Sequence, residues 1–114
     1  MLEWSHESER EVDWLLGAAL IVRREAIDQI GLMDERYFLY LEDVDWCYRM
    51  NLSGWKVYYV PEAQIIHHYR QGSQSKTLLS RDVLIHLVSM LRYYDKWNNV
   101  IYHLKKMASV LRNP

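Results

Sequence analysis

The chain has 114 residues, of which 50% are hydrophobic and 25% charged, a composition typical of one small globular domain and not of a disordered segment. Its single cysteine, Cys47, excludes an internal disulfide and a zinc site built from cysteines, and it fits a reducing compartment. No apolar run approaches the roughly 20 residues of a membrane-spanning helix. Residues 1–69 carry 13 acids and 6 bases, whereas residues 70–114 carry 2 acids and 8 bases. This asymmetry indicates either that the halves face different partners or that the basic tail packs on the acidic half.

The first third of the chain predicts a short lead-in, a buried strand and a helix. Residues 1–11 are polar, acidic and aperiodic, as in a loose lead-in. Residues 12–22 (VDWLLGAALIV) predict a strand buried on both faces, with a buried helix as the alternative. The small residues Gly17, Ala18 and Ala19 indicate close packing against this backbone. Residues 24–30 predict a short helix that Gly31 closes.

A second helix is predicted from Glu42 to about Ser53. Leu41, Val44, Tyr48 and Leu52 fall on one apolar stripe, and Gly54 supplies the stop. The carboxylates of Glu42, Asp43 and Asp45 would occupy its first turn, where the helix dipole favours negative charge. Asp45 and Arg49 are spaced for an ion pair on the helix surface.

The remaining elements are two extended segments, a loop and a helical tail. Residues 55–60 predict a strand, residues 63–68 a second extended run, and residues 70–76 a polar loop with basic ends. Residues 77–113 predict helix, interrupted at Asn98 and Asn99. These helices are basic and amphipathic and carry Tyr and Trp, so they fit either an anionic membrane surface or a helix pair that packs on the sheet or self-associates.

Two groups of residues could carry chemistry. The acidic cluster of Glu42, Asp43 and Asp45 is a helix start, an ion-pair network, or a site for a metal or for proton transfer. Flanking aromatic residues would partly desolvate it and raise at least one pKa toward useful base strength. Neighbouring His67 and His68 point to opposite faces of an extended segment, so at most one of them would serve a given site, for example as a metal ligand.

The order of these motifs closely resembles glycosyltransferase family 2, in particular its rhamnosyltransferase-type members, which build bacterial surface polysaccharides. The resemblance covers about residues 12–76. The residues that carry it, in chain order, are Gly17 to Arg24, Ile30 to Phe38, Leu41 to Arg49, Gly54-Trp55, Tyr59 to Ala63, and Ile66 to His68.

The resemblance implies an α/β fold: the C-terminal half of a Rossmann-like GT-A domain, seen as α+β in this chain, with a helical extension. It implies an inverting transferase that uses a nucleotide-diphosphate sugar and Mg²⁺ or Mn²⁺. Asp43 matches the catalytic base and Glu42 its acidic neighbour. His67, with His68 as the alternative, matches the family's metal-ligating histidine. Gly17 and Ala18 match the family's small residues on the acceptor side of the site. Trp46 is a further expected substrate contact, and Arg70 and Ser73 could contact phosphate from the loop that would close over the diphosphate.

This interpretation divides the chain into a lead-in (1–11), an acceptor-side half-domain (12–76) and a basic helical extension (77–114). The Asp-x-Asp motif of the family's nucleotide-binding half is not found ahead of this region, so we expect no turnover by the chain alone. The expected acceptor is a glycan or a lipid-linked sugar, and the expected location is the cytoplasm, at the inner face of the cell membrane. The alternative is a non-catalytic module that oligomerises or binds a membrane or partner. Nucleic acid is not an expected partner, because the acidic front half opposes it.

Overall fold

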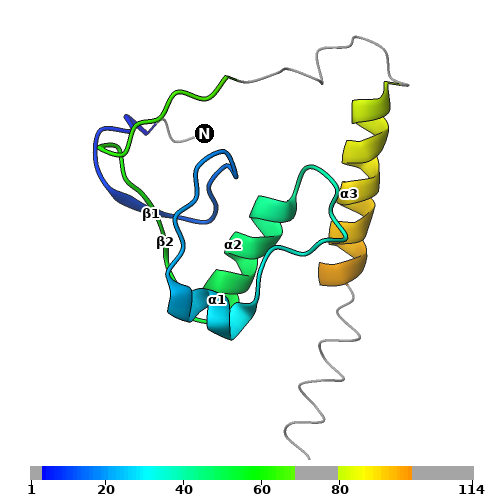
Figure 1. Cartoon of the computed structure of the whole chain (residues 1–114), viewed down its shortest axis with the longest axis horizontal. Coiled ribbons are helices and arrows are strands. Elements are labelled where there is room, and N and C mark those ends of the chain that lie inside the picture. Colours follow the sequence, from blue (N-terminus) through cyan, green and yellow to red (C-terminus); the bar gives the residue numbers. More distant parts are fainter. Residues whose placement is uncertain (1–3, 69–79, 99–114) are drawn as a thin grey trace, which may run out of the picture.

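The computed structural model of the protein describes residues 4–68 and 80–98. Figure 1 shows one helix at the centre, two strands and a short helix on one side of it, and a long helix on the other. In chain order the elements are β1 (Arg10–Val12), α1 (Arg24–Ile30), α2 (Glu42–Leu52), β2 (Val57–Tyr59) and α3 (Arg81–Trp97). The described part is therefore a small mixed α/β unit, as expected in class, with only two short strands.

The two strands form an antiparallel pair that brings the start of the chain against its middle. Arg10 lies opposite Tyr59 and Val12 opposite Val57. The aromatic and β-branched residues of β2 favour this extended form. Strand β2 confirms the strand expected within residues 55–60. The prediction that residues 1–11 form an irregular lead-in is wrong for the last two of them, because β1 begins at Arg10.

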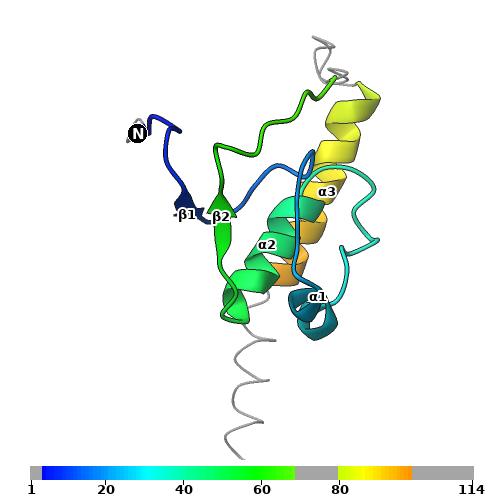
Figure 2. The same ribbon diagram turned by 60° about the vertical axis from the view of Figure 1, so that its left-hand side comes forward.

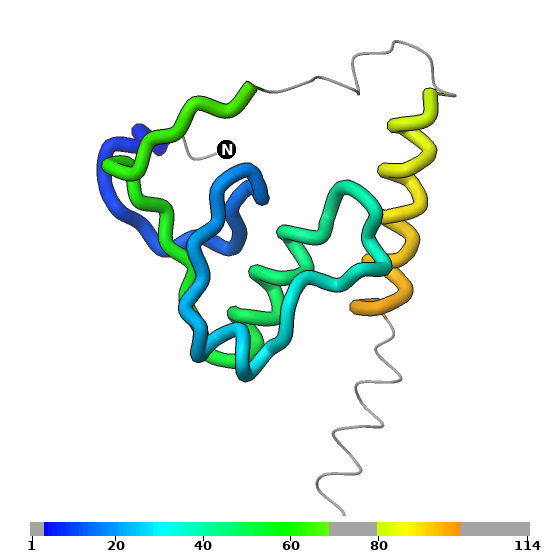
Figure 3. The backbone as a smooth tube through the Cα atoms, viewed as in Figure 1, coloured from blue at the N-terminus to red at the C-terminus, as the bar shows by residue number. Residues whose placement is uncertain are grey.

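The long strand expected over residues 12–22 is not formed, and neither is the alternative helix. After β1 the chain runs to α1 without regular structure, turning at Gly17 and Ala18 (Figure 3). Leu20 and Val22 pack on the core, but Ile21 between them is 100% exposed. A strand buried on both faces needs neighbouring strands to pair with its backbone groups, and the described residues form no strand that pairs with residues 13–22. Residues 63–68 likewise form no strand.

Both short-range helix predictions for the front half are confirmed. Helix α1 ends at Gly31, whose N–H donates to the Ile27 carbonyl over 2.8 Å and whose φ of 78° suits a residue without Cβ. Helix α2 carries all three acids in its first turn, and its C-cap is Ser53. Gly54 follows with a φ of 83°.

The buried face of α2 differs from the predicted stripe. The buried side chains of α2 are Asp43, Asp45, Trp46, Cys47 and Met50, while Tyr48 and Leu52 are exposed. The apolar partners on β1, α1 and the segment between them lie on the Cys47 side, where Trp46, Cys47, Met50 and Val57 form the core cluster. The partners that pack on α2 therefore determine which of its faces is buried, and the most apolar stripe of the helix does not.

Helix α3 runs beside α2 in both views of the ribbon (Figures 1 and 2). Its N-cap is Ser80, whose Oγ accepts from the Val83 N–H, and its end at Asn98 confirms the predicted interruption. The rest of the predicted helical tail lies outside the described residues. None of the helices in residues 4–68 and 80–98 is long and apolar enough to span a bilayer.

Candidate active site

The start of α2 is positioned by an unusual stretch of backbone. Tyr40 and Leu41, the two residues before the helix, have φ values of 70° and 69°. Consecutive left-handed conformations are unfavourable for residues with a Cβ, costing about 1–3 kcal/mol each, and they persist only where the surroundings hold them. Here the Tyr40 ring packs on His86 of α3, with 4.8 Å between ring centroids. The bend therefore aims the acidic first turn, and α3 helps to hold it.

Asp43 is held by backbone N–H groups from two segments. Its Oδ2 accepts from Gly17 over 2.7 Å and its Oδ1 from Val44 over 2.8 Å. The residue is 7% exposed and lies at the positive end of the α2 dipole. A carboxylate has about four acceptor positions, so two remain available to another donor.

Gly17 is brought against Asp43, as the packing of small residues in this segment suggested. A Cβ placed on Gly17 would lie 3.3 Å from the Asp43 Cβ and 3.4 Å from its Oδ2. Any larger residue would press on the carboxylate, so the absence of a side chain at position 17 sets the position of Asp43. Ala18 follows on the exposed side of the same turn.

Glu42 has an enclosed oxygen that lacks a donor. Its Oε2 is buried and accepts no hydrogen bond from the part of the chain that the structure describes. An unsatisfied buried acceptor costs about 1–3 kcal/mol, so such an atom calls for a donor from elsewhere. The two neighbouring carboxylates thus differ: backbone N–H groups orient Asp43, whereas Glu42 has an oxygen that accepts no hydrogen bond from the described residues.

Asp45 is the centre of an ion-pair network. Its predicted pair with Arg49 forms at 3.0 Å, but the surface location expected for it is wrong, because Asp45 is 0% exposed. Lys96 approaches both of its oxygens, at 2.8 and 2.9 Å, and the Trp97 indole N–H donates to it over 2.7 Å. Charged and polar donors from α3 therefore compensate the burial of this carboxylate.

The network extends to the turn before the acidic cluster. Lys96 also pairs with Asp34 at 2.8 Å. The Arg36 guanidinium, together with Lys96, holds the pKa of Asp34 far below its usual range. Nearby Tyr37 is buried, and this burial, with the charges of Asp45 and Asp34, raises the pKa of its phenol. Sequence reasoning missed Asp34 and Lys96 as partners because 62 positions separate them.

Arg49 also has a second role. Its guanidinium donates to the carbonyl oxygens of Ile30 and Leu32, each over 2.7 Å. These carbonyls flank Gly31 at the end of α1, so one side chain joins α1, α2 and the buried Asp45. Neither the spacing nor the charge of Arg49 indicates this second role.

The other predicted site residues lie in different places. Trp46 is in the core, where its indole N–H donates to the Gly31 carbonyl over 2.9 Å. His67 and His68 are exposed in the extended segment after β2. Arg70 and Ser73 lie outside the described residues. Of the predicted set, the structure brings together Gly17, Asp43 and Glu42.

The described residues do not make a complete metal site. They contain no group of three or more His, Cys, Asp or Glu side chains placed to hold an ion. The letters Asp43-Val44-Asp45 spell an Asp-x-Asp, but Arg49, Lys96 and Trp97 already occupy Asp45. A Mg²⁺ or Mn²⁺ ion would need ligands beyond these residues.

A cavity opens beside the start of α2. It has a volume of about 350 Å³ and touches Leu41, the residue just before Glu42. Its other walls come from α3 and the residue after it, and they are largely aromatic: His86, Met90, Tyr93, Tyr94, Trp97 and Asn98. Such a cavity is within the usual size range of small-molecule sites, about 300–1,000 Å³.

Comparison with known proteins places this chain in a family. The model of glycosyltransferase-like family 2 matches residues 2–83, the N-terminal part of this chain up to the first turn of α3. The chain belongs to this family. The match includes Gly17, the whole of α2 and the extended segment with His67, and it leaves residues 84–114 outside.

The curated relatives that match are rhamnosyltransferases. The N-acetylglucosaminyl-diphospho-decaprenol L-rhamnosyltransferase of Mycobacterium tuberculosis is 54% identical over 61 residues, 54% of this chain and 20% of that protein. The rhamnosyltransferase WbbL of Escherichia coli K12 is 35% identical over 86 residues, covering 75% and 32%. The dTDP-rhamnosyl transferase RfbF of Shigella flexneri is 28% identical over 91 residues, covering 80% and 29%. The chain thus spans about a fifth to a third of these relatives, and no solved structure matches it.

Proposed function

We propose that this chain is the acceptor-side half of an inverting transferase that moves rhamnose from a nucleotide-diphosphate donor to a lipid-linked or glycan acceptor. The names of the relatives support the sugar, the nucleotide and the lipid-linked acceptor. The placement in the acceptor-side half rests on the order in which Glu42 to Asp45 and Val60 to Ala63 follow one another in the chain. It does not rest on the family match, which covers residues 2–83, the front part of this chain.

The observation that carries the proposal is the way in which Asp43 is held. An inverting displacement needs one base, which takes the proton from the acceptor hydroxyl as its oxygen attacks the anomeric carbon. The N–H groups of Gly17 and Val44 fix the Asp43 carboxylate and leave acceptor positions free. The bond to the diphosphate breaks as the new glycosidic bond forms, and the proton ends on Asp43.

Glu42 would orient the acceptor. Its Oε2 lacks a donor within the described residues, so a second hydroxyl of the acceptor sugar can donate to it. The fixed orientation of Asp43 and this spare acceptor next to it could define which hydroxyl is deprotonated.

The donor diphosphate and its metal would be held mainly by residues other than those described. A divalent ion, if bound, neutralises charge on the departing diphosphate, and His67 could contribute one ligand to it. Arg70 and Ser73 remain proposed contacts of the diphosphate. We keep the expectation that the chain alone does not transfer sugar.

The test is a chimera of the E. coli relative in which residues 2–83 of this chain replace the matching residues. Transfer of radiolabelled rhamnose from dTDP-rhamnose to the relative's acceptor is measured for the chimera, for Asp43→Asn and for Glu35→Gln, an exposed acid outside the site. We expect Asp43→Asn to lower kcat at least about 10²-fold, the lower end of the usual contribution of general base catalysis, and Glu35→Gln to change it less than twofold. A folded chimera without transfer, or an active Asp43→Asn variant, would contradict the proposal.

A further inference from the structure

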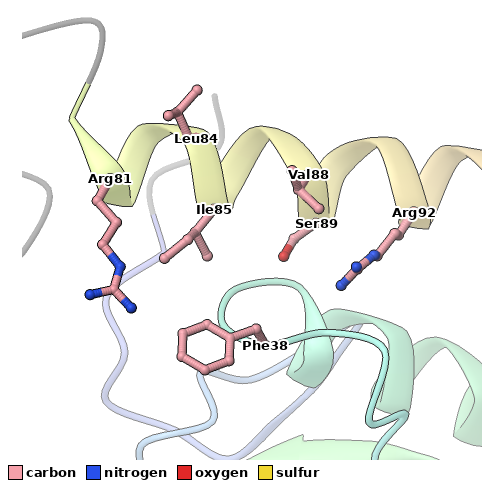
Figure 4. Close-up of a pocket in the computed structure, with 7 residues that line it drawn as sticks. All are labelled: Phe38, Arg81, Leu84, Ile85, Val88, Ser89 and Arg92. Atoms are coloured by element: carbon pink, nitrogen blue, oxygen red, sulfur yellow. The ribbon is translucent and has the colours of Figure 1, made fainter.

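A second cavity lies on α3 beside the loop that leads into the acidic cluster. It has a volume of about 360 Å³. Its apolar lining comes from Phe38 on the loop and from Leu84, Ile85 and Val88 on α3, and Ser89 and two arginines complete it. None of these lining residues is acidic. Figure 4 shows the Phe38 ring below Ile85, so the loop and the helix form two sides of the cavity.

The two arginines give the cavity a positive rim. Figure 4 shows the guanidinium groups of Arg81 and Arg92 on either side of the Phe38 ring, both extending toward the side on which the ring lies. They are eleven positions apart, which is about 16 Å along a helix. Arg92 already donates to the Arg36 carbonyl. Arg81 forms no hydrogen bond or ion pair with any residue in 4–68 or 80–98, so it is the more available cation.

The wall of the cavity is joined to the loop that leads into the acidic cluster. Ser89, the only buried residue of α3, donates to the Leu39 carbonyl over 2.7 Å and so fixes the loop next to Phe38. Phe38 precedes Asp43 by five residues, and their Cα atoms can therefore be at most about 18 Å apart. A molecule bound at Phe38 would lie within that distance of the proposed base.

We propose that this cavity binds an isoprenyl diphosphate, with the apolar chain against Phe38, Ile85 and Val88 and the diphosphate paired with Arg81. Phe38 is 74% exposed, so its ring is open to an apolar ligand and forms one apolar wall of the cavity with Ile85 and Val88. Arginine pairs well with phosphate oxygens because its N–H groups form a planar fork. The proposal rests on the proposed function in one respect: a lipid-linked acceptor would be the natural source of such a group.

The test uses the 114-residue chain and farnesyl diphosphate, with binding measured by titration calorimetry. Inorganic pyrophosphate tests charge alone, and farnesol tests the apolar chain alone. We expect farnesyl diphosphate to bind at least about tenfold more tightly than either probe, which corresponds to 1.4 kcal/mol. Equal affinity for pyrophosphate would overturn the proposal, since it would show a simple cation–anion contact.

Matched variants locate the site. Phe38→Ala and Arg81→Gln should each weaken binding about fivefold or more. Leu91→Ala, another exposed apolar residue of α3, and Arg23→Gln, another exposed arginine, should leave it unchanged. Equal losses in the site and control variants would mean general adsorption to the chain and would sink the proposal. All four side chains are exposed, and circular dichroism is used to check that each variant is folded.

The two proposals can fail separately. Asp43→Asn should bind farnesyl diphosphate as the unchanged chain does, because Asp43 does not line this cavity. Binding without transfer by the chimera would refute the proposed function alone. Transfer by the chimera without binding of farnesyl diphosphate to the chain would refute the isoprenyl site alone.

Discussion

At the scale of single residues, the acidic cluster separates into three different carboxylates. Asp43 is held by backbone N–H groups, Glu42 keeps an oxygen without a donor, and Asp45 is neutralised by side chains from its own helix and from α3. Backbone donors orient a carboxylate without cancelling its charge, whereas Lys96 and Arg49 do cancel it. This difference is why Asp43, and not Asp45, is suited to accept a proton.

Gly17 is the residue whose replacement tests that orientation. In the chimera, Gly17→Ala should lower kcat about tenfold, because the added methyl group would displace the Asp43 carboxylate by a few tenths of an ångström, and a shift of 1 Å can cost about 10²-fold. Rhamnose transfer and the urea unfolding midpoint are both measured. Ala19→Ser, two positions along the same exposed turn, is the control and should be close to neutral. Full activity of Gly17→Ala would show that contact with Gly17 does not set the position of Asp43.

At the scale of elements, α3 is attached mainly through polar contacts. Its only buried residue is Ser89, and Lys96 and Trp97 supply its connections to Asp34 and Asp45. An edge-to-face contact of 4.6 Å between the rings of Tyr48 and Trp97 adds apolar contact. A helix with so little buried apolar surface depends on these few partners for its position.

Lys96→Met should therefore loosen α3. Removing the ammonium group leaves Asp45 with two donors and Asp34 with one charged partner, so we expect a loss of about 2 kcal/mol in the free energy of unfolding. Urea denaturation followed by circular dichroism measures it. Lys56→Met removes the exposed pair with Glu11 and is the matched control, which should behave like the unchanged chain. A loss no larger than that of the control would mean that Lys96 does not hold α3.

Local sequence signals gave the helices but not the contacts between elements. Gly31 and Gly54 marked where α1 and α2 end, because a positive φ favours glycine over other residues. The inward face of α2 was predicted wrongly, since Cys47 and Met50 are buried by residues of β1 and α1 that are distant in sequence. Asp45 and Lys96 lie 51 positions apart, and no periodicity reports such a pairing. The site was predictable at Glu42 and Asp43 because they stand in a recognisable motif.

At the scale of the whole molecule, little apolar surface is enclosed. The buried hydrophobic residues of the described part number six. Large apolar side chains stay exposed both between β1 and α1 and after β2, including Leu16, Ile21, Ile65 and Ile66. The first stretch lies in the predicted buried strand of residues 12–22, and the second in the predicted extended run of residues 63–68. Exposed apolar patches of this kind commonly mark surfaces that other structure covers.

We predict that these two stretches become strands in the longer chimera. In the 114-residue chain the amides of residues 20–23 and 64–66 donate to no backbone carbonyl of the described residues, so hydrogen exchange there should be close to that of an unfolded peptide. In the chimera, pairing with neighbouring strands should slow the exchange of both stretches at least about tenfold. The amides of α2, which are helical in either context, serve as the internal control. Rapid exchange in an active chimera would mean that the apolar run of residues 12–22 functions as a loop, and the strand interpretation of that run would then be wrong in the larger protein as well.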